Sequence, residues 1–398
     1  MNTYYLMNKD KIVAEVSGKT TIGETETFRI EKQYDNYLPY GFQTMNLWLE
    51  NRPAAKHRAH IKQLMKELGC DTKTGLIDMT RCVATTDSFW VKRENDPLKW
   101  KDVSLYQNEF DPLISQFAYD GRGLYGKKFS STTGELSLSG NYGKCLIRVS
   151  GSNKIELVKH GSEGFSNAEN EPYSEVLAQQ VAEQMNYPHA EYRLTKYRGK
   201  LASVCPLFTT DNIGLISVDQ CFNHTPDIDE IRTYYQSLGF EKEFNQMIIF
   251  DALVLNSDRH LGNLGFLVNN DTGEILSPAP LFDHNLSFMP LLARPEDYQR
   301  VYAEQAPILY HDFISAAAYS LSSNEQAKLI KLKEYNLQDP GYDFPAWKLE
   351  INNHMLHQQI DCILRSRERD KQKEAEPPKK KRHRIRDRLT GEYRWVDD

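Results

Sequence analysis

The chain has 398 residues, a formal net charge of −6, and 40% hydrophobic and 11% aromatic residues. This length allows two or more domains or one large bilobal unit, and the composition is that of a globular protein with disorder confined to segments. Residues 365–388 hold twelve Lys or Arg and five Asp or Glu, a net charge of +7, so the rest of the chain carries −13. This acidic body argues against extended nucleic-acid binding outside the basic segment.

The cysteines and the first residues indicate where the protein functions. The six cysteines lie far apart and form no Cys-x-x-Cys pair, so we expect reduced thiols. The first six residues lack the basic and apolar regions of a signal peptide, and no apolar run approaches the ~18 residues of a membrane span. We therefore expect a soluble, cytoplasmic protein without membrane contact.

The first 110 residues are expected to form an accessory N-terminal region. Residues 3–18 alternate as in a short β-hairpin. Residues 41–68 have helical spacing that is interrupted at Pro53, and residues 89–92 have the composition of a strand.

A loop rich in Gly and Ser follows over residues 130–144 and leads into a strand at 145–149. Gly140 and Gly143 could bring backbone N–H groups against phosphate oxygens, because glycine lacks the Cβ that would hold a ligand away. The loop is not a Walker A motif, and taken alone it fits an ordinary flexible hairpin better.

The next strand, residues 155–159, places Lys159 on the same face as two apolar side chains. A half-buried ammonium needs an anionic partner, which ATP phosphates would provide; the alternative is an exposed strand end. A helix is predicted to begin at Glu171, and Glu171 and Glu175 lie one turn apart near its start. Either glutamate could pair with Lys159, and spacing alone does not choose between them.

The most informative stretch is residues 256–285, which we expect to follow a buried helix at 244–255. Apolar residues 264–268 predict a strand, and the turn residues after it predict a hairpin. Such a hairpin would bring Asp283 back towards Asp258 and Asn263.

Two carboxylates and an amide in this arrangement suit phosphoryl transfer. The reaction needs one carboxylate that orients the attacking hydroxyl, and an amide with a second carboxylate that holds Mg²⁺ on the phosphates. The Asp-x-x-x-x-Asn spacing of Asp258 and Asn263 is also that of a protein-kinase catalytic loop. The alternative is that these residues, with Asp283, only form turns; the ordered series of helix, loop, hairpin and second acid favours the functional interpretation.

These motifs resemble those of the HipA-like kinases, whose loop is Asn-x-Asp-x-His-x-x-Asn, here over residues 256–263. The resemblance extends from about residue 85 to about residue 365. It implies a bilobal, protein-kinase-like α+β fold with a small β-rich N-lobe and a mostly α C-lobe. The expected parts are an accessory region (1–110), a nucleotide-binding small lobe (111–210), an α-helical large lobe (211–365) and a basic, disordered tail (366–398).

The resemblance also implies a function, which is Mg²⁺-dependent transfer from ATP to a Ser or Thr hydroxyl of a protein substrate by a toxin-type kinase with a possible antitoxin-like partner. The family pattern Pro-Tyr-x-Glu favours Glu175 over Glu171 as the residue that holds Lys159. Carried over to this sequence, the site residues are Lys159 on the phosphates, Asp258 on the nucleophile, His260 shaping the catalytic loop, and Asn263 and Asp283 on the metal.

Two features depart from the family pattern. His284 and Asn285 are bulkier than the residues that usually follow the metal-binding Asp, which could alter the order of that loop. The Gly-rich loop cannot be aligned firmly, so the autophosphorylation site that silences some family members stays open. The candidates are Ser130, Ser131, Thr132, Thr133, Ser137 and Ser139.

The C-terminal part is predicted to be helical at 298–305, 312–321, 324–332 and 347–365. The basic tail beyond it is expected to be solvated or to make nonspecific nucleic-acid contact.

Two other functions remain open from the sequence. The loop 258–263 also matches phosphoinositide-type lipid kinases, although these have Phe-Gly after the metal Asp. A pseudokinase that binds nucleotide or a partner without turnover is the third possibility.

Overall fold

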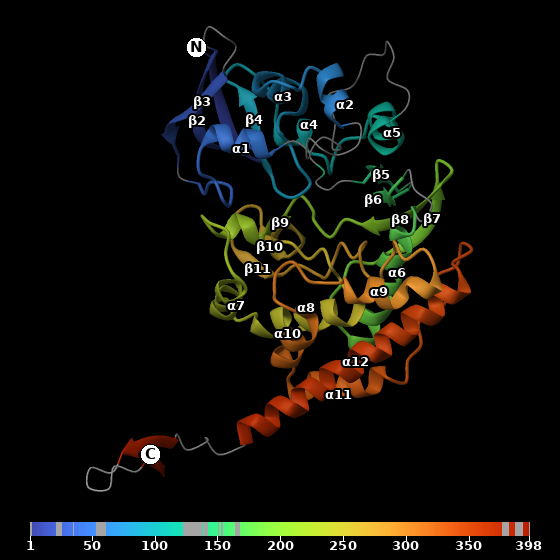
Figure 1. Ribbon diagram of the computed structural model, residues 1–398. Coiled ribbons are helices and arrows are strands. Elements are labelled where there is room, and N and C mark those ends of the chain that lie inside the picture. Colours follow the sequence, from blue (N-terminus) through green and yellow to red (C-terminus); the bar gives the residue numbers. More distant parts are fainter. Residues whose placement is uncertain are drawn as a thin grey trace.

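The computed structural model describes residues 2–20, 26–34, 36–52, 61–121, 138, 142–149, 151–152, 154–163, 168–375, 382–386 and 393–397. Three sheets stand above a helical region, as Figure 1 shows from the N-terminal region at the top to the long helix α12 below. This mixed arrangement, β-rich first and helical later, is the α+β architecture predicted from the sequence.

The N-terminal region is a four-stranded antiparallel sheet in the order β3-β2-β1-β4. The predicted hairpin at 3–18 and the predicted strand at 89–92 are both confirmed, and β4 pairs with β1. Helices cover the sheet, and their apolar side chains share one core with it. The elements are β1 (Asn2–Asn8), β2 (Lys11–Thr20), β3 (Glu26–Gln33), α1 (Met45–Asn51), α2 (Ile61–Glu67), α3 (Lys73–Thr80), β4 (Phe89–Arg93) and α4 (Trp100–Val103).

The second sheet, in the order β5-β6-β8-β7, carries the predicted nucleotide-binding strands. Helix α5 connects it to the N-terminal region, because Ile114 and Phe117 belong to the N-terminal core while Tyr119 packs against β5 and β6. The elements are α5 (Pro112–Asp120), β5 (Lys144–Arg148), β6 (Ile155–His160), α6 (Glu171–Met185), β7 (Arg193–Tyr197) and β8 (Lys200–Pro206).

The third sheet, in the order β11-β10-β9, holds the predicted hairpin after the catalytic loop. Its third strand, β9, was not predicted, because the strand has only five residues and pairs with β10 across about fifty residues of chain. The buried helix predicted at 244–255 is α8. The elements are β9 (Ile213–Ser217), η2 (Val218–Cys221), α7 (Ile228–Ser237), α8 (Glu241–Val254), η3 (Leu261–Asn263), β10 (Gly265–Asn269) and β11 (Ile275–Pro278).

The C-terminal helices pack with α6 and α8 into one large apolar core. Their predicted positions are confirmed, but α12 continues ten residues beyond the predicted end at 365, so the predicted disordered tail begins as helix. Beyond α12, two antiparallel strands at 382–386 and 393–397 pair with each other. The elements are η4 (Pro295–Asp297), α9 (Tyr298–Ala303), α10 (Phe313–Ser320), α11 (Ser323–Leu332), α12 (Ala346–Ala375), β12 (Arg382–Arg386) and β13 (Tyr393–Asp397).

The N-terminal region is attached to the β10–β11 turn by a polar cluster. Asn8 Nδ2 and the Tyr37 hydroxyl both donate to the carbonyl oxygen of Asn270, at 2.9 and 2.7 Å. The Tyr40 hydroxyl donates to the carbonyl of Gly273 at 2.7 Å. These contacts hold the N-terminal region beside the central cleft.

Two findings bear on the cellular setting. All six cysteines, which lie within the described residues, are free thiols as predicted. Among the helices that the structure describes, none combines the length and the apolar character needed to cross a bilayer.

Candidate active site

A cleft of about 900 Å³ lies where the second and third sheets meet the N-terminal region. Lys159, Glu175, Asp258, Asn263 and Asp283 all line it, together with the exposed His260. The structure thus brings together six predicted site residues that are spread over 125 positions of the chain.

Lys159 lies on β6 at the centre of this cleft, with only 7% of its surface exposed. Its Nζ contacts Glu175 Oε1 at 3.2 Å and also donates to Asp283 Oδ1. Burial by itself lowers the pKa of Lys159, but the two carboxylates outweigh burial and raise it above its usual value. The ammonium is therefore charged, and its anionic partners within the chain are Glu175 and also Asp283, which the sequence analysis placed only on the metal.

Glu175 lies in the second turn of α6 and connects Lys159 to the backbone of the residue that follows Asp283. Its Oε1 contacts Lys159, and its Oε2 accepts the backbone N–H of His284 at 2.7 Å. Burial raises the pKa of Glu175, and the Lys159 ammonium opposes this shift. Glu171, the other candidate, is buried one turn earlier, and both its carboxylate oxygens lack a partner among the described residues. Of the two glutamates, the geometry pairs Glu175 with Lys159.

Asp283 has the left-handed backbone conformation, with φ of 57°, that non-glycine residues rarely adopt. Its backbone N–H donates to the hydroxyl of the half-buried Tyr192 at 3.0 Å. Burial opposes ionisation of Asp283, but the positive charges of Lys159 and then Lys144 hold its pKa below the ordinary value. A strained, ionised carboxylate at a cleft wall is typical of a functional position.

The catalytic-loop candidates come from the turn between α8 and β10. Burial raises the pKa of Asp258, and the nearby His260 opposes this shift. Asn263 Nδ2 donates to the Asp258 carbonyl at 3.2 Å, which leaves the amide oxygen of Asn263 without a partner among the described residues. His260 Nδ1 accepts the N–H of Gly262 at 3.1 Å, so this side chain shapes the loop as expected from the resemblance.

Arg259 holds the loop from the protein interior. Its role was not identified from the sequence. This side chain is 1% exposed, and its guanidinium forms an ion pair with the fully buried Asp251 at 2.9 Å. It also donates to the carbonyl oxygens of Asn263 at 2.6 Å and Phe282 at 3.0 Å. One buried cation therefore connects α8, the catalytic loop and the residue before Asp283.

His284, the bulky residue that follows Asp283, is buried in the protein interior. The His284 ring packs against Phe250 with 5.0 Å between ring centroids, and its Nδ1 accepts from Arg259 Nη2 at 3.3 Å. Burial, reinforced by the Arg259 charge, lowers the pKa of His284 well below its usual value. A neutral His284 thus anchors the loop that carries Asp283.

Lys144 is a second cation in the cleft that the site prediction missed. It lies directly opposite Lys159 in the β5–β6 register, so both side chains point to the same face of the sheet. Lys144 is 5% exposed and lines the cleft. The signal was present in the sequence, because Lys144 directly precedes the predicted strand at 145–149, next to the strand that ends in Lys159.

The Gly-rich loop is mostly outside the described residues. Gly140 and all six candidate phosphorylation sites fall there. Gly143 is described, and a Cβ at this position would come within 2.0 Å of the His160 ring and 2.4 Å of the Tyr119 carbonyl oxygen. Glycine is therefore needed at position 143 because the backbone there packs closely against His160 and Tyr119.

Comparisons with known proteins agree with this geometry. Residues 158–339 match the family model of the HipA-like kinases. Among solved structures, the HipA of Shewanella oneidensis MR-1, in a toxin–antitoxin complex with HipB and its operator DNA, matches with a TM-score of 0.56 at 11% identity. That alignment covers 92% of this chain and 99% of the HipA chain.

A proinflammatory kinase of Helicobacter pylori, CtkA, aligns with a TM-score of 0.44 at 18% identity, over 57% of this chain and 95% of CtkA. No curated protein matches the sequence. The fold predicted from the sequence is thus confirmed by the likeness to HipA, and residues 158–339, slightly less than half of the chain, are similar to the HipA-like kinases.

Proposed function

We propose that this protein transfers the γ-phosphoryl group of ATP, with Mg²⁺, to a Ser or Thr hydroxyl of a protein substrate. The observation that carries the proposal is the buried Lys159, held between Glu175 and Asp283 in the cleft that Asp258 and Asn263 also line. Phosphoryl transfer depends on positioning and electrostatic stabilisation, and these five residues supply the groups for both.

The donor set fits Mg²⁺. This ion prefers oxygen ligands and is commonly held by one or two carboxylates together with substrate phosphates. Asp283 offers an ionised carboxylate and Asn263 an amide oxygen without a partner among the described residues. Mg²⁺, when bound, would neutralise charge on the phosphates. The described residues contain no cluster of three or more His, Cys, Asp or Glu that could hold a metal.

The charges at this end of the cleft also favour an anionic nucleotide with its cation. Lys144 and Lys159 supply two positive charges, and Glu175, Asp258 and Asp283 supply three negative charges. The lysines would face the phosphates, and Glu175 keeps Lys159 oriented. These groups leave one negative charge more than positive, which a divalent ion would offset.

Asp258 is the proposed group that orients the acceptor hydroxyl and accepts its proton. It is half-buried in the cleft wall, and its backbone N–H donates to Asn256 Oδ1 at 3.3 Å. Burial raises the pKa of Asp258, which makes it a better proton acceptor than an exposed aspartate while it stays ionised.

Apolar residues at the other end of the cleft suit an adenine ring. Leu157, Cys205 and Leu207 line it beside Phe208, whose ring lies 5.5 Å from that of Phe282. The chain leaves β8 at Pro206, so backbone groups of this segment are the proposed partners of the adenine edge.

The deciding experiment incubates the purified protein with γ-labelled ATP and Mg²⁺, beside Asp258→Ala and Asp283→Ala variants checked for folding. Asp297→Ala, a half-buried acid outside the cleft, is the matched control. We expect label on protein Ser or Thr with the parent and the control, and loss of at least about a hundredfold in both cleft variants. Nucleotide binding without turnover would favour a pseudokinase, and label on lipid vesicles a lipid kinase.

Four further proposals remain to be tested. The Gly/Ser-rich loop is a candidate for autophosphorylation, and mass spectrometry after incubation with ATP would locate phosphate within residues 130–140 or find none. The HipA of S. oneidensis was solved with HipB and operator DNA, so we propose an antitoxin-like partner for this chain, testable by co-purification with neighbouring gene products. We also propose a cytoplasmic location, and the boundaries 110 and 210 for the parts of the chain, with the end of the large lobe moved from 365 to the end of α12 at 375.

A further inference from the structure

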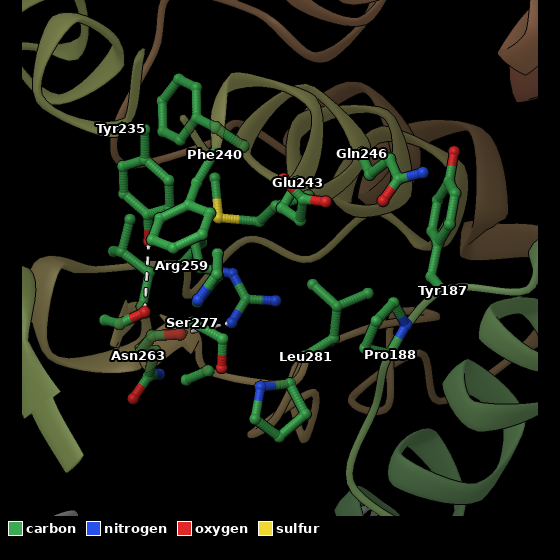
Figure 2. A pocket seen from close by; sticks show the side chains of 17 residues that line it. Tyr187, Pro188, Tyr235, Phe240, Glu243, Gln246, Arg259, Asn263, Ser277 and Leu281 are labelled. Atoms are coloured by element: carbon green, nitrogen blue, oxygen red, sulfur yellow. Dashed lines mark hydrogen bonds between the residues drawn. The ribbon is translucent and has the colours of Figure 1, made fainter. Parts of the chain in front are cut away.

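A second cavity, of about 290 Å³, lies behind the catalytic loop and apart from the cleft. Its walls come from α7 and α8, from the catalytic loop, and from two extended segments at 187–188 and 277–281 (Figure 2). Asn263 lines both the cavity and the cleft, so the two spaces share one residue of the catalytic loop.

The cavity wall is mostly apolar and aromatic. Tyr235, Phe240 and Met247 face it from the helices, and Leu281 and Pro188 face it from the other side (Figure 2). Its volume is that of about ten water molecules, which is room for one small ring with a short chain. An apolar ring would gain burial against several rings at once.

Two charged residues belong to this wall, and only one is uncompensated. Arg259 is neutralised by Asp251, and its N–H groups donate to Asp251, to two carbonyl oxygens and to His284. Glu243 is half-buried and has no hydrogen-bond or ion-pair partner among the described residues. Figure 2 shows Glu243 on the α8 side of the cavity, beside Gln246. The uncompensated charge of the cavity is therefore negative.

We propose that this cavity is a binding site for a small aromatic amine. The ring lies among the aromatic and proline side chains, and the ammonium pairs with Glu243. The inference is independent of the proposed phosphoryl transfer, because it concerns a different space and is tested by binding alone.

The test measures binding of three probes that share a phenylethyl group to the full-length protein at low salt, by ligand-observed NMR and calorimetry. The probes are 2-phenylethylamine, 2-phenylethanol and 3-phenylpropionate. We expect the amine to bind with a Kd on the order of 1 mM, as is usual for so small a ligand. It should bind about two- to fivefold more tightly than the alcohol, the range of a partly exposed ion pair. The carboxylate should bind most weakly.

Matched variants separate the charge from the cavity. Glu243→Gln should equalise the amine and the alcohol, whereas Glu241→Gln, an exposed acid on the same helix outside the cavity, should keep the preference. Ala279→Leu should fill the space and abolish binding of all three probes, with folding checked by thermal melting. The proposal is overturned by the absence of saturable amine binding, by equal or tighter binding of the carboxylate, or by an amine preference that survives in Glu243→Gln.

Discussion

Replacing Arg259 with methionine tests whether one buried cation holds the catalytic loop in place. The side chain is 1% exposed, and its partner Asp251 is 0% exposed, so no solvent screens the pair. Methionine preserves much of the apolar volume but leaves Asp251 as a buried charge whose remaining side-chain partner is Asn256 Nδ2 at 3.0 Å. Breaking a buried pair in this way costs about 3–5 kcal/mol. The carbonyl oxygens of Asn263 and Phe282 also lose their donor. We take the cost of this loss as included in the range of about 3–5 kcal/mol.

The assay is urea unfolding, with amide hydrogen exchange of peptides over residues 244–265 to assign the change to the large lobe. Arg300→Met is the matched control, because Arg300 is exposed and its ion pairs with Asp297 and Glu304 lie in solvent; we expect no measurable change there. A double variant, Asp251→Leu with Arg259→Met, removes both charges and should recover at least half of the lost stability.

Two results would refute this reasoning. One is a loss below about 1 kcal/mol in Arg259→Met, which would mean that the buried charge relaxes to solvent. The other is a double variant as unstable as the single one, which would place the cost in packing and not in the unpaired carboxylate.

Three further predictions concern the same core. Tyr192→Phe removes the acceptor of the Asp283 backbone N–H and should destabilise the protein by about 1–3 kcal/mol, measured by denaturant unfolding, and lower phosphoryl transfer. Glu175→Gln weakens the orientation of Lys159 and should lower kcat/KM for ATP by about ten- to a hundredfold, measured by initial rates. Burial lowers the pKa of Lys348 to about 8, so between about pH 8 and the ordinary lysine value the unfolded state binds the extra proton. Stability of the parent relative to Lys348→Met should therefore rise with pH through that window, measured by urea unfolding at several pH values.

Controls and contrary outcomes for these three are specific. Tyr319→Phe changes a 72% exposed tyrosine and should be neutral; an equally neutral Tyr192→Phe would contradict the role of that hydroxyl. Glu183→Gln lies on α6 outside the cleft and should leave kcat/KM unchanged, whereas a matching loss in both variants would point to the helix and not to the ion pair. Lys242→Met, on the exposed start of α8, is the control for the pH dependence. If the stability of the parent relative to Lys348→Met stays flat or falls as pH rises, burial does not destabilise the charged form of Lys348.

Local sequence patterns were sufficient for most elements around the site. The β10–β11 hairpin was predictable because apolar strand residues and turn residues are adjacent in the chain, and so was the buried helix α8. Strand β9 was not, because five residues become a strand only by pairing with β10. The predicted end of the long helix α12 was ten residues too early. The polar composition beyond residue 365 is typical of a disordered tail, but it is also compatible with a helix.

The sequence by itself determined which chemical groups are present and in what order, because the spacing of Asp258 and Asn263 and the later Asp283 are properties of the chain. Spacing alone left Glu171 and Glu175 as alternatives, because they lie one turn apart on the same helix; the family resemblance favoured Glu175, and the tertiary structure pairs Glu175 with Lys159. It alone placed Arg259 in the interior beside Asp251, whereas an Arg between Asp and His in a polar loop suggests exposure. The physical reason is that periodicity is local, whereas the burial of a charge depends on partners that only folding brings together.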